Sequence, residues 1–365
     1  MKRLKFGIIG CGGIANQKHL PALTYLNEEV EIVGLCDIIV ERAQKAKKEY
    51  GLDNATVYED YQELLKDETI DVIHVCTPNV SHSFITVEAL EAGKHVLCEK
   101  PMAINSQEAK KMIEAAERTG KKLTIGYQNR YRDDAQFAHK VCSAGELGDI
   151  YYGEAYAIRR RAVPTWGVFM DKEKQGGGPL IDIGTHALDL TLWMMDNYEP
   201  AIVVGSTFSK LTDKPEANMF GPWDPKTFDV EDSAFGFIKM KNGATIFLKA
   251  SWALNTTDTR EAMFSLSGTE AGFEMTGSAF DGTMTYNINS EKNGQLIETK
   301  PAKAAQIAYF SEDQSDSEST REVRQWLDAI HNDREPCVKP TQAYVVTQIL
   351  EAIYESEKTG KAVYF

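Results

Sequence analysis

Over the first 128 residues, short continuous apolar runs alternate with segments in which apolar residues recur every three or four positions. The runs predict buried strands and the amphipathic segments predict helices. Strands of this kind, linked by helices, are typical of a parallel sheet covered on both faces, which right-handed crossovers wind into a doubly wound fold. The predicted strands are LKFGIIG (4–10), VEIVGLCD (30–37), DVIHVCTP (71–78), KHVLCEKP (94–101) and KLTIGYQ (122–128), with helices at 40–51, 81–93 and 106–120.

Beyond about residue 149 the pattern changes to longer strand-like segments, and Asn242-Gly243 between two of them predicts a tight hairpin turn. Helices are expected again near residues 320–330 and 344–358. We therefore expect an α/β protein with a doubly wound parallel sheet in residues 1–125. Residues 126–365 should form an α+β domain with an open, mostly antiparallel sheet. Its predicted strands lie at 149–160, 201–210, 233–241, 244–252, 263–275, 283–289 and 294–300.

The acidic composition narrows the range of partners. The chain has 365 residues, a formal net charge of -14 and a pI near 5.1. Nucleic acids and anionic membrane surfaces attract basic faces, so neither is expected as a partner. The N-terminal apolar run is too short for a signal peptide or a membrane span, and no other segment is long enough to cross a bilayer. A cytoplasmic protein is therefore expected.

Four of the six cysteines, at positions 11, 36, 76 and 98, lie at the ends of apolar runs and have no CxxC spacing. This placement favours buried thiols over a zinc site. It also gives no sign of a disulfide framework, which agrees with a reducing compartment.

The first candidate site follows the first predicted strand. Gly10-Cys11-Gly12-Gly13-Ile14-Ala15 matches G-x-G-x-x-A and leads into a predicted helix, as in a dinucleotide-binding Rossmann domain. Asp37 ends the second strand, where a carboxylate that binds the ribose hydroxyls belongs; a helix cap is the alternative role. Ile38 and Ile39 offer no cation for a 2′-phosphate, although Arg42 lies one turn further on. The pattern favours NAD over NADP.

Four further stretches carry a family resemblance. They are Cys76-Thr77-Pro78-Asn79 with His82, Glu99-Lys100-Pro101, Gly126-Tyr127-Gln128-Asn129-Arg130, and GGGPLIDIGTHALDL (176–190). Together with the glycine loop, they make the chain resemble the glucose–fructose oxidoreductase/inositol dehydrogenase family, often called Gfo/Idh/MocA. The resemblance extends over nearly the whole chain, and the motifs arrive in the family's order.

The resemblance implies NAD(P)-dependent oxidation or reduction of a sugar, cyclitol or related polyol. It also implies a homodimer or homotetramer formed through the sheet of the second domain. By the family pattern Lys100, Asp182 and His186 are the catalytic residues, and Arg160, Trp166 and Asn129 lie at the substrate. The residues implied to bind the cofactor are Gly10, Gly12, Gly13, Ile14, Ala15, Asp37, Arg42, Thr77, Pro78, Asn79, His82, Glu99, Lys100 and Asn129.

The chemistry of alcohol oxidation gives an independent reason for the catalytic residues. Removing a hydride from a carbinol carbon also requires removing the hydroxyl proton, so a base that titrates near neutral pH and a cationic hydrogen-bond donor are both useful. Imidazole meets the first need and an ammonium group the second, which favours His186 and Lys100. If Pro179 begins a helix, Asp182 falls in its first turn and lies on one face with His186 and Asp189.

Several alternatives stay open at the level of sequence. Asp182 and His186 are also compatible with a metal site, although no further ligands lie near them in the sequence. A capped helix that carries a core histidine is another alternative. The arginines at 159–161 fit surface charges as well as substrate ligands, and Tyr156 and Tyr309 are weaker candidates. An oxidation–elimination glycosidase or a sugar sensor that binds a dinucleotide without catalysis would carry the same cofactor motif.

Overall fold

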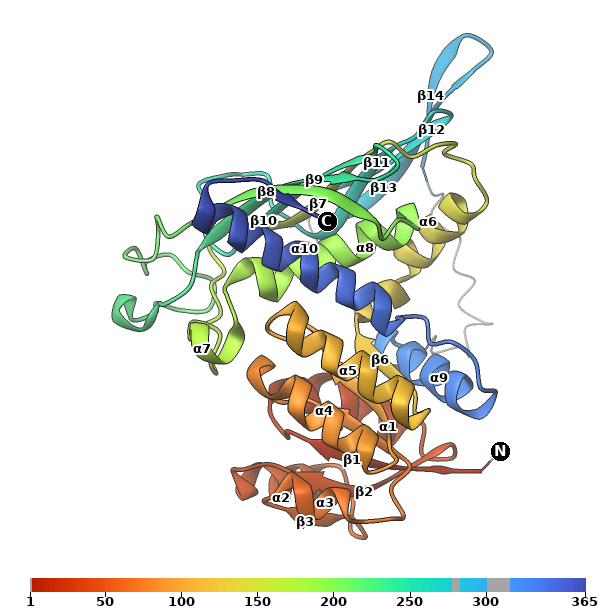
Figure 1. The fold of residues 1–365 in the computed structure, drawn as a ribbon, viewed down its shortest axis with the longest axis vertical. Coiled ribbons are helices and arrows are strands. Elements are labelled where there is room, and N and C mark those ends of the chain that lie inside the picture. Colours follow the sequence, from red (N-terminus) through yellow and green to blue (C-terminus); the bar gives the residue numbers. More distant parts are fainter. Residues whose placement is uncertain (1, 278–282, 301–315) are drawn as a thin grey trace. The chain divides into compact units, whose positions relative to one another are not determined.

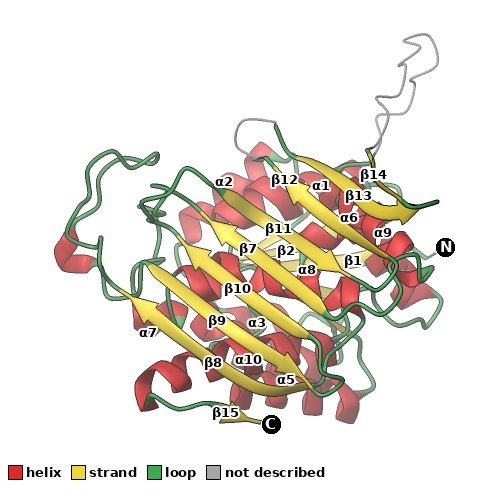
Figure 2. Cartoon of the chain, turned by 90° about the horizontal axis from the view of Figure 1, so that it is seen from above, coloured by secondary structure: helices red, strands yellow, loops and turns green. Residues whose placement is uncertain are grey.

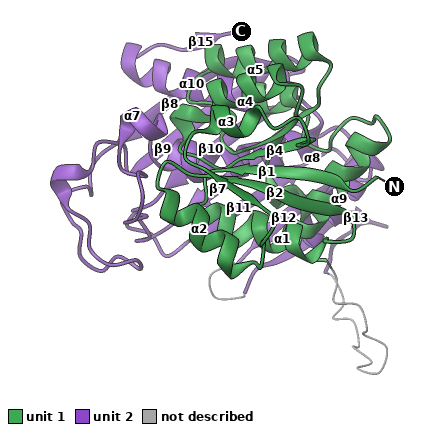
Figure 3. Cartoon of the chain, turned by 90° about the horizontal axis from the view of Figure 1, so that it is seen from below, with its two compact units in different colours: residues 1–131, 315–344 green, residues 132–314, 345–365 purple. Residues whose placement is uncertain are grey.

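The computed structural model describes residues 2–277, 283–300 and 316–365. The chain divides into two compact units (Figure 3). The first comprises Met1–Tyr131 and Ser315–Tyr344, and the second comprises Arg132–Gln314 and Val345–Phe365.

The first unit is built on a six-stranded sheet in which every pairing is parallel, in the order β3-β2-β1-β4-β5-β6. This is the strand order of dinucleotide-binding Rossmann domains, so the predicted doubly wound fold is confirmed. Figure 1 labels β1, β2, β3 and β6 of this sheet. The strands are β1 Leu4–Ile9, β2 Val30–Cys36, β3 Thr56–Tyr58, β4 Val72–Val75, β5 His95–Glu99 and β6 Leu123–Gly126. The helices are α1 Leu20–Tyr25, α2 Val40–Glu49, α3 Tyr61–Leu65, α4 His82–Glu91, α5 Ser106–Thr119 and α9 Glu318–His331, with a π-helical turn η1 Ala15–His19 and 3-10 turns η2 Asn79–Ser81 and η3 Gln128–Tyr131.

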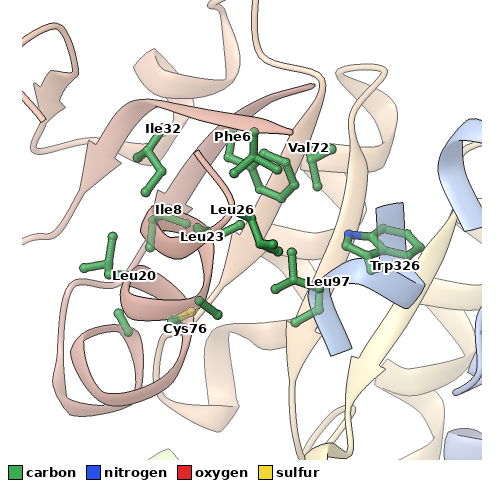
Figure 4. Packing of buried hydrophobic residues seen from close by; sticks show 14 of the residues in the cluster. Phe6, Ile8, Leu20, Leu23, Leu26, Ile32, Val72, Cys76, Leu97 and Trp326 are labelled. Atoms are coloured by element: carbon green, nitrogen blue, oxygen red, sulfur yellow. The ribbon is translucent and has the colours of Figure 1, made fainter. Parts of the chain in front are cut away.

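Helix α9 completes the core of this unit although it lies almost 200 residues beyond β6 in the chain. Its Trp326 is 1% exposed and belongs to the same apolar cluster as Leu97 of β5 and Leu23 of α1 (Figure 4). Burying an indole of this size removes a large apolar area from water and stabilises the unit. The first unit therefore depends on a segment from the far end of the chain.

The second unit contains a nine-stranded sheet in the order β14-β13-β12-β11-β7-β10-β9-β8-β15. The pair β7–β10 is parallel and the other pairs in this order are antiparallel, which confirms the predicted open, mostly antiparallel sheet. The strands are β7 Tyr152–Ile158, β8 Pro200–Phe208, β9 Ser233–Met240, β10 Thr245–Ser251, β11 Arg260–Ser267, β12 Ala271–Thr276, β13 Thr285–Lys292, β14 Gln295–Thr299 and β15 Val363–Tyr364. The helices are α6 Asp133–Ser143, α7 Lys172–Gln175 and α8 Thr185–Met195, with a π-helical turn η4 Leu180–Gly184 and a 3-10 turn η5 Pro225–Thr227. Helix α10 Pro340–Thr359 begins in the first unit and belongs to the second from Val345 onward.

The two faces of this sheet have different surroundings. Helix α8 packs beneath β7 and β11 (Figure 2). Ile353 of α10 packs against Gly205 and Gly236. Along β9 the residues alternate: Ile238 is buried toward the helices, while Phe237 is 36% exposed on the opposite face. The predicted hairpin is present. Strands β9 and β10 pair antiparallel, and Gly243 in the turn between them has a φ of 92°.

Two properties of the described residues bear on the expected setting of the protein. No helix among them combines the length and apolar character needed to span a bilayer. All six cysteines are free thiols, and those at positions 11, 36, 76 and 98 are buried as predicted.

Candidate active site

The glycine loop connects β1 to the helix that begins with η1. Gly10 has a φ of 92°, and a Cβ added there would lie 2.6 Å from the carbonyl oxygen of Cys76. Only glycine fits this position, since a side chain would meet both strained backbone and a neighbouring carbonyl. At Gly12 and Gly13 an added Cβ would meet no atom within 4 Å. The loop therefore has an open side at a helix N-terminus, which fits a pyrophosphate.

Two substitutions separate the folding role of this loop from its binding role. Gly10→Ala should lower the melting temperature and the free energy of unfolding, by roughly 1–3 kcal/mol, because it forces a side chain into a positive-φ position. Gly12→Ala should leave the melting temperature unchanged but weaken NAD binding, because its methyl group occupies space at the open side of the loop. Thermal unfolding and NAD titration measure the two effects. Unchanged NAD affinity in Gly12→Ala would show that the pyrophosphate lies elsewhere.

Asp37 holds the glycine loop to the next helix. Its side chain is 7% exposed at the end of β2; Oδ2 accepts a hydrogen bond from the Cys11 amide at 2.9 Å and Oδ1 accepts one from the Ile39 amide at 2.8 Å. The N-cap of α2 is Ile39, without a side-chain cap bond, so Asp37 does not cap this helix. Ile38 is 84% exposed beside it.

The remaining loop residues of the first unit lie at the same edge of the sheet. Ile9 pairs with Cys36 on one side and with Val75 on the other, and Glu99 pairs with Gly126. The strands are parallel, so their carboxyl ends and the loops that follow lie along one edge, where doubly wound sheets bind ligands. These loops carry Thr77, Pro78, Asn79, Lys100, Pro101 and Asn129.

His82 joins two of these loops. Its Nδ1 lies 2.8 Å from the carbonyl oxygen of Pro101, and its Nε2 lies 2.9 Å from that of Thr77. Burial lowers the pKa of His82, and the two carbonyl oxygens that face its ring nitrogens oppose this shift. The side chain thus fixes the loop after β4 to the loop after β5.

Glu99 lies at the centre of a buried charged cluster. Its Oε1 lies 2.7 Å from Lys18 Nζ and 2.7 Å from His19 Nε2, and its Oε2 accepts a hydrogen bond from the Lys100 amide at 3.1 Å. Burial opposes ionisation, yet Lys18 and His19 hold the pKa of Glu99 well below its usual range. The ionised carboxylate therefore anchors the backbone of Lys100 from inside the unit.

The cluster extends to helix α9 and strand β4. Lys18 Nζ also lies 2.9 Å from Glu322 Oε2, and the Glu322 and Glu99 carboxylates raise the pKa of Lys18 despite its burial. His19 Nδ1 lies 2.9 Å from His74 Nδ1. Burial, together with His19 and Lys18, lowers the pKa of His74, which keeps that ring neutral. Removal of one partner of the buried Lys18–Glu99 ion pair should lower the free energy of unfolding by about 3–5 kcal/mol, because the other charge is left buried without a partner.

In the second unit, Asp182 and His186 lie at the start of one helix. Pro179 is the N-cap of the turn η4, as predicted, but the turn is π-helical and α8 begins only at Thr185. The expectation of regular α-helical spacing from Pro179 is therefore wrong, although one turn still separates Asp182 from His186. Single π turns of this kind are frequent at functional sites.

The two side chains have different surroundings. Asp182 is partly exposed, and its Oδ2 accepts a hydrogen bond from Trp252 Nε1 at 3.0 Å. Trp252 is fully buried at the end of β10, so it fixes the carboxylate from the sheet side. His186 is 8% exposed and Asp189 is 1% exposed. This segment thus carries a partly exposed carboxylate that Trp252 holds in place and, four residues further on, a buried imidazole.

Glu231 explains the glycines that precede this helix. Both of its carboxylate oxygens lie 3.0 Å from the Gly178 amide, and its Oε1 accepts hydrogen bonds from the Leu180 amide at 3.2 Å and from the Tyr354 hydroxyl at 2.8 Å. A Cβ at Gly177 would lie 2.0 Å from the Tyr354 hydroxyl oxygen. Burial raises the pKa of Glu231. The glycines let Glu231 and Tyr354 approach the helix start.

The three arginines that follow β7, at positions 159–161, have different surroundings. Arg159 forms a bidentate ion pair with Glu261, with Nε 2.6 Å from Oε2. Arg160 is exposed, and Arg161 Nη2 lies 2.8 Å from Asn255 Oδ1. Trp166 is 53% exposed.

Tyr156 lies between the Arg260 guanidinium, 4.3 Å from its ring, and the Glu154 carboxylate, to which its hydroxyl bonds. Tyr309 lies outside the described residues. Within those residues, no group of three or more His, Cys, Asp and Glu side chains is placed to hold a metal ion.

Comparison with known proteins places both parts of the chain in one family. Residues 4–127 match the oxidoreductase family with an NAD-binding Rossmann fold, and residues 140–365 match the C-terminal alpha/beta domain of the same family. D-glucoside 3-dehydrogenase from Escherichia coli is 34% identical over 99% of this chain and 97% of its own length. Inositol 2-dehydrogenase from Salmonella typhimurium is 36% identical over 53% of this chain and 55% of its own length.

Solved structures show the same fold from end to end. An oxidoreductase domain protein from Kribbella flavida superposes with a TM-score of 0.84 at 22% identity, over 100% of this chain and 99% of that one. Levoglucosan dehydrogenase in complex with NADH and L-sorbose has a TM-score of 0.83 at 22% identity, with the same coverage. The chain belongs to the Gfo/Idh/MocA oxidoreductase family and carries its NAD-binding Rossmann domain.

Proposed function

We propose that the protein is an NAD-dependent dehydrogenase that oxidises a secondary ring hydroxyl of a glucoside. The observation that carries this proposal is the similarity to D-glucoside 3-dehydrogenase, which extends over almost the full length of both chains. Free sugars and inositols, the substrate class of the second relative, are the alternatives within the same chemistry.

The glycine loop and Asp37 would bind the cofactor in the first unit. The open side of Gly12 and Gly13 receives the pyrophosphate, and Asp37 accepts from the ribose hydroxyls with the lone pairs that its two amide contacts leave free. The exposed side chain of Ile38 next to Asp37 disfavours the 2′-phosphate of NADP. Further residues assigned to the cofactor are Ile14, Ala15, Arg42, Thr77, Pro78, Asn79 and Asn129. His82 and Glu99 support it through the loops that they fix.

The catalytic step assigned to this chain is the movement of one proton. NAD, held by the glycine loop and Asp37, would supply the acceptor for the hydride of the carbinol carbon. His186 takes the hydroxyl proton as general base, and the Lys100 ammonium donates a hydrogen bond to the oxygen as negative charge develops on it. Asp182, held by Trp252, accepts from a substrate hydroxyl and orients the sugar. Asn129, Arg160 and Trp166 complete the proposed substrate contacts.

An absorbance assay tests this function. Purified protein is mixed with NAD or NADP and with a panel of glucosides, free aldoses and inositols, and both NADH formation and the sugar product are measured. We expect NADH and an equal amount of keto-glucoside, with NAD preferred over NADP. Cleaved glucoside without net NADH would instead support an oxidation–elimination glycosidase. Dinucleotide binding without turnover of any substrate would support a sensor.

We also propose that the open face of the second sheet joins copies of the chain into a homodimer or homotetramer. Phe237 and Phe247 face each other across β9 and β10 with ring centroids 5.4 Å apart, and both rings are more than one-third exposed. Clustered apolar side chains on one sheet face are typical of association surfaces. The free thiols in the chain agree with a reducing cytoplasm as its proposed location.

Phe237→Glu should lower the molar mass measured by light scattering to that of a smaller assembly, because the substitution places a charge in the proposed interface. Tyr25→Glu is the matched control, since Tyr25 is 54% exposed on helix α1 of the first unit. An unchanged mass in Phe237→Glu would remove this face from the interface.

A further inference from the structure

Two loops of the second unit expose a group of large apolar side chains. Trp166, Met219 and Phe220 are 53%, 60% and 37% exposed, and the rings of Trp166 and Phe220 meet edge to face with centroids 4.9 Å apart. We call these three residues the apolar platform. Single exposed apolar residues are ordinary, but a group of them on one surface marks a place where something binds.

Polar contacts hold the platform in place. Asn218 Oδ1 accepts from the Val163 amide at 2.8 Å, and its Nδ2 donates to the carbonyl oxygens of Val163 at 3.0 Å and Gly221 at 2.7 Å. The Thr165 hydroxyl donates to the carbonyl of Phe220 at 2.8 Å. These bonds tie the two loops together, so the exposed side chains sit on a preorganised backbone. A ligand that binds there does not have to order the loops, so little binding free energy is lost to that ordering.

A second set of contacts anchors the loop that carries Phe220. The Trp223 ring is 5% exposed, and its Nε1 donates to the carbonyl of Thr212 at 2.7 Å. Trp223 also meets Phe228, which in turn meets Trp252. The loop thus buries one tryptophan for support and leaves its neighbours Met219 and Phe220 exposed.

Aromatic contacts connect the platform to the candidate active site within the same unit. The Trp166 ring lies 5.9 Å from that of Phe169, the Phe169 ring lies 6.5 Å from that of Trp252, and Trp252 donates its hydrogen bond to Asp182. Two ring-to-ring contacts therefore separate Trp252 from the platform.

We propose that the apolar platform binds the aglycone of the glucoside substrate, so that the enzyme prefers glucosides with an aryl or alkyl aglycone over free glucose. The inference rests on the proposed function. The aglycone leaves the sugar at the anomeric carbon, which differs from the carbon that is oxidised, so it points away from the reacting hydroxyl. Aromatic rings and a thioether bind apolar groups by dispersion and by burial of surface. Free glucose has only a hydroxyl at this position and gains nothing from the platform.

Kinetic comparison of two substrates tests the proposal. The measured quantity is the ratio of kcat/KM for phenyl glucoside to kcat/KM for glucose, and we expect Trp166→Ala to lower this ratio about 10-fold, as loss of an aromatic contact and its buried area implies. Phe220→Ala and Met219→Ala should lower it in the same direction. Tyr151→Ala is the matched control, because Tyr151 is 57% exposed in the same unit and should leave the ratio unchanged. An unchanged ratio in Trp166→Ala overturns the proposal.

Binding experiments separate this inference from the proposed function. In saturation-transfer NMR with NAD present, the phenyl protons of phenyl glucoside should receive saturation from the wild-type protein and lose most of it in Trp166→Ala. Phenyl protons without saturation overturn the platform even if the glucoside is oxidised, whereas saturation without NADH formation overturns only the dehydrogenase. A drop in molar mass of Trp166→Ala in light scattering also overturns the proposal, because the platform would then be an interface between copies of the chain.

Discussion

Lys100→Met should lower kcat/KM for glucoside oxidation roughly 10³-fold, which lies within the range for loss of a positioned acid–base or electrostatic group. The loss should fall mainly on kcat, because the proposed ammonium acts on the charge that develops on the substrate oxygen. Lys100 is partly exposed at the carboxyl end of β5, and Glu99 holds its amide, so the substitution should leave the melting temperature nearly unchanged. Steady-state kinetics and thermal unfolding measure both.

Lys110→Met is the control for this substitution. Lys110 is exposed on helix α5 and forms a surface pair with Glu114 at 3.8 Å, which contributes little to stability. Its kinetics should match those of the wild type. Lys100→Met with wild-type kcat would remove Lys100 from the catalytic residues and leave it a strand-end lysine.

His186→Ala should lower kcat/KM by about 10²- to 10⁴-fold, because the proposed general base is lost and water must take the proton. The wild-type rate should fall on the acid side of the pH profile, since a protonated imidazole cannot accept the hydroxyl proton. In His186→Ala this acid limb should disappear, so the relative loss of rate is largest at the pH values above it. Kinetics over a series of buffers measure the profile.

His331→Gln, in the last turn of α9, is the control and should keep both the rate and the pH limb. A pH profile of wild-type shape in His186→Ala would mean that another group accepts the proton. Asp189, which is buried on the same helix, would then be the next residue to test.

The sheet of the first unit was predictable because local sequence and final burial agree. Strands buried on both faces must be apolar throughout, so a run such as Phe6 to Ile9 can be recognised as a strand from the local sequence alone. The glycine loop was predictable for the same reason, since its spacing is local and its strand and helix context lies within 25 residues. Long-range features gave no such signal. Helix α9 has an ordinary amphipathic pattern that fits many surfaces, and nothing in it indicates packing against α1.

The polar supports of the site could not be inferred from sequence. Lysine usually lies on surfaces and histidine is often partly exposed, yet Lys18 and His19 are 5% and 1% exposed around Glu99. Glu231 lies about 50 residues from the helix that it holds, and no motif connects the two. Gly177 and Gly178 were the only trace of it in the sequence, because they mark a close approach without showing what approaches. Side-chain partners of this kind are set by tertiary packing and not by spacing.

Transfer of deuterium from a labelled glucoside to the nicotinamide tests the central claim most directly. A glucoside that carries deuterium on the carbon of a single ring hydroxyl, beginning with C3, is incubated with the protein and NAD, and the nicotinamide product is examined by NMR. The proposed dehydrogenase predicts deuterium at C4 of the nicotinamide, accompanied by the corresponding keto-glucoside. Reduced cofactor without deuterium from any labelled ring carbon, or no reduced cofactor at all, would contradict it.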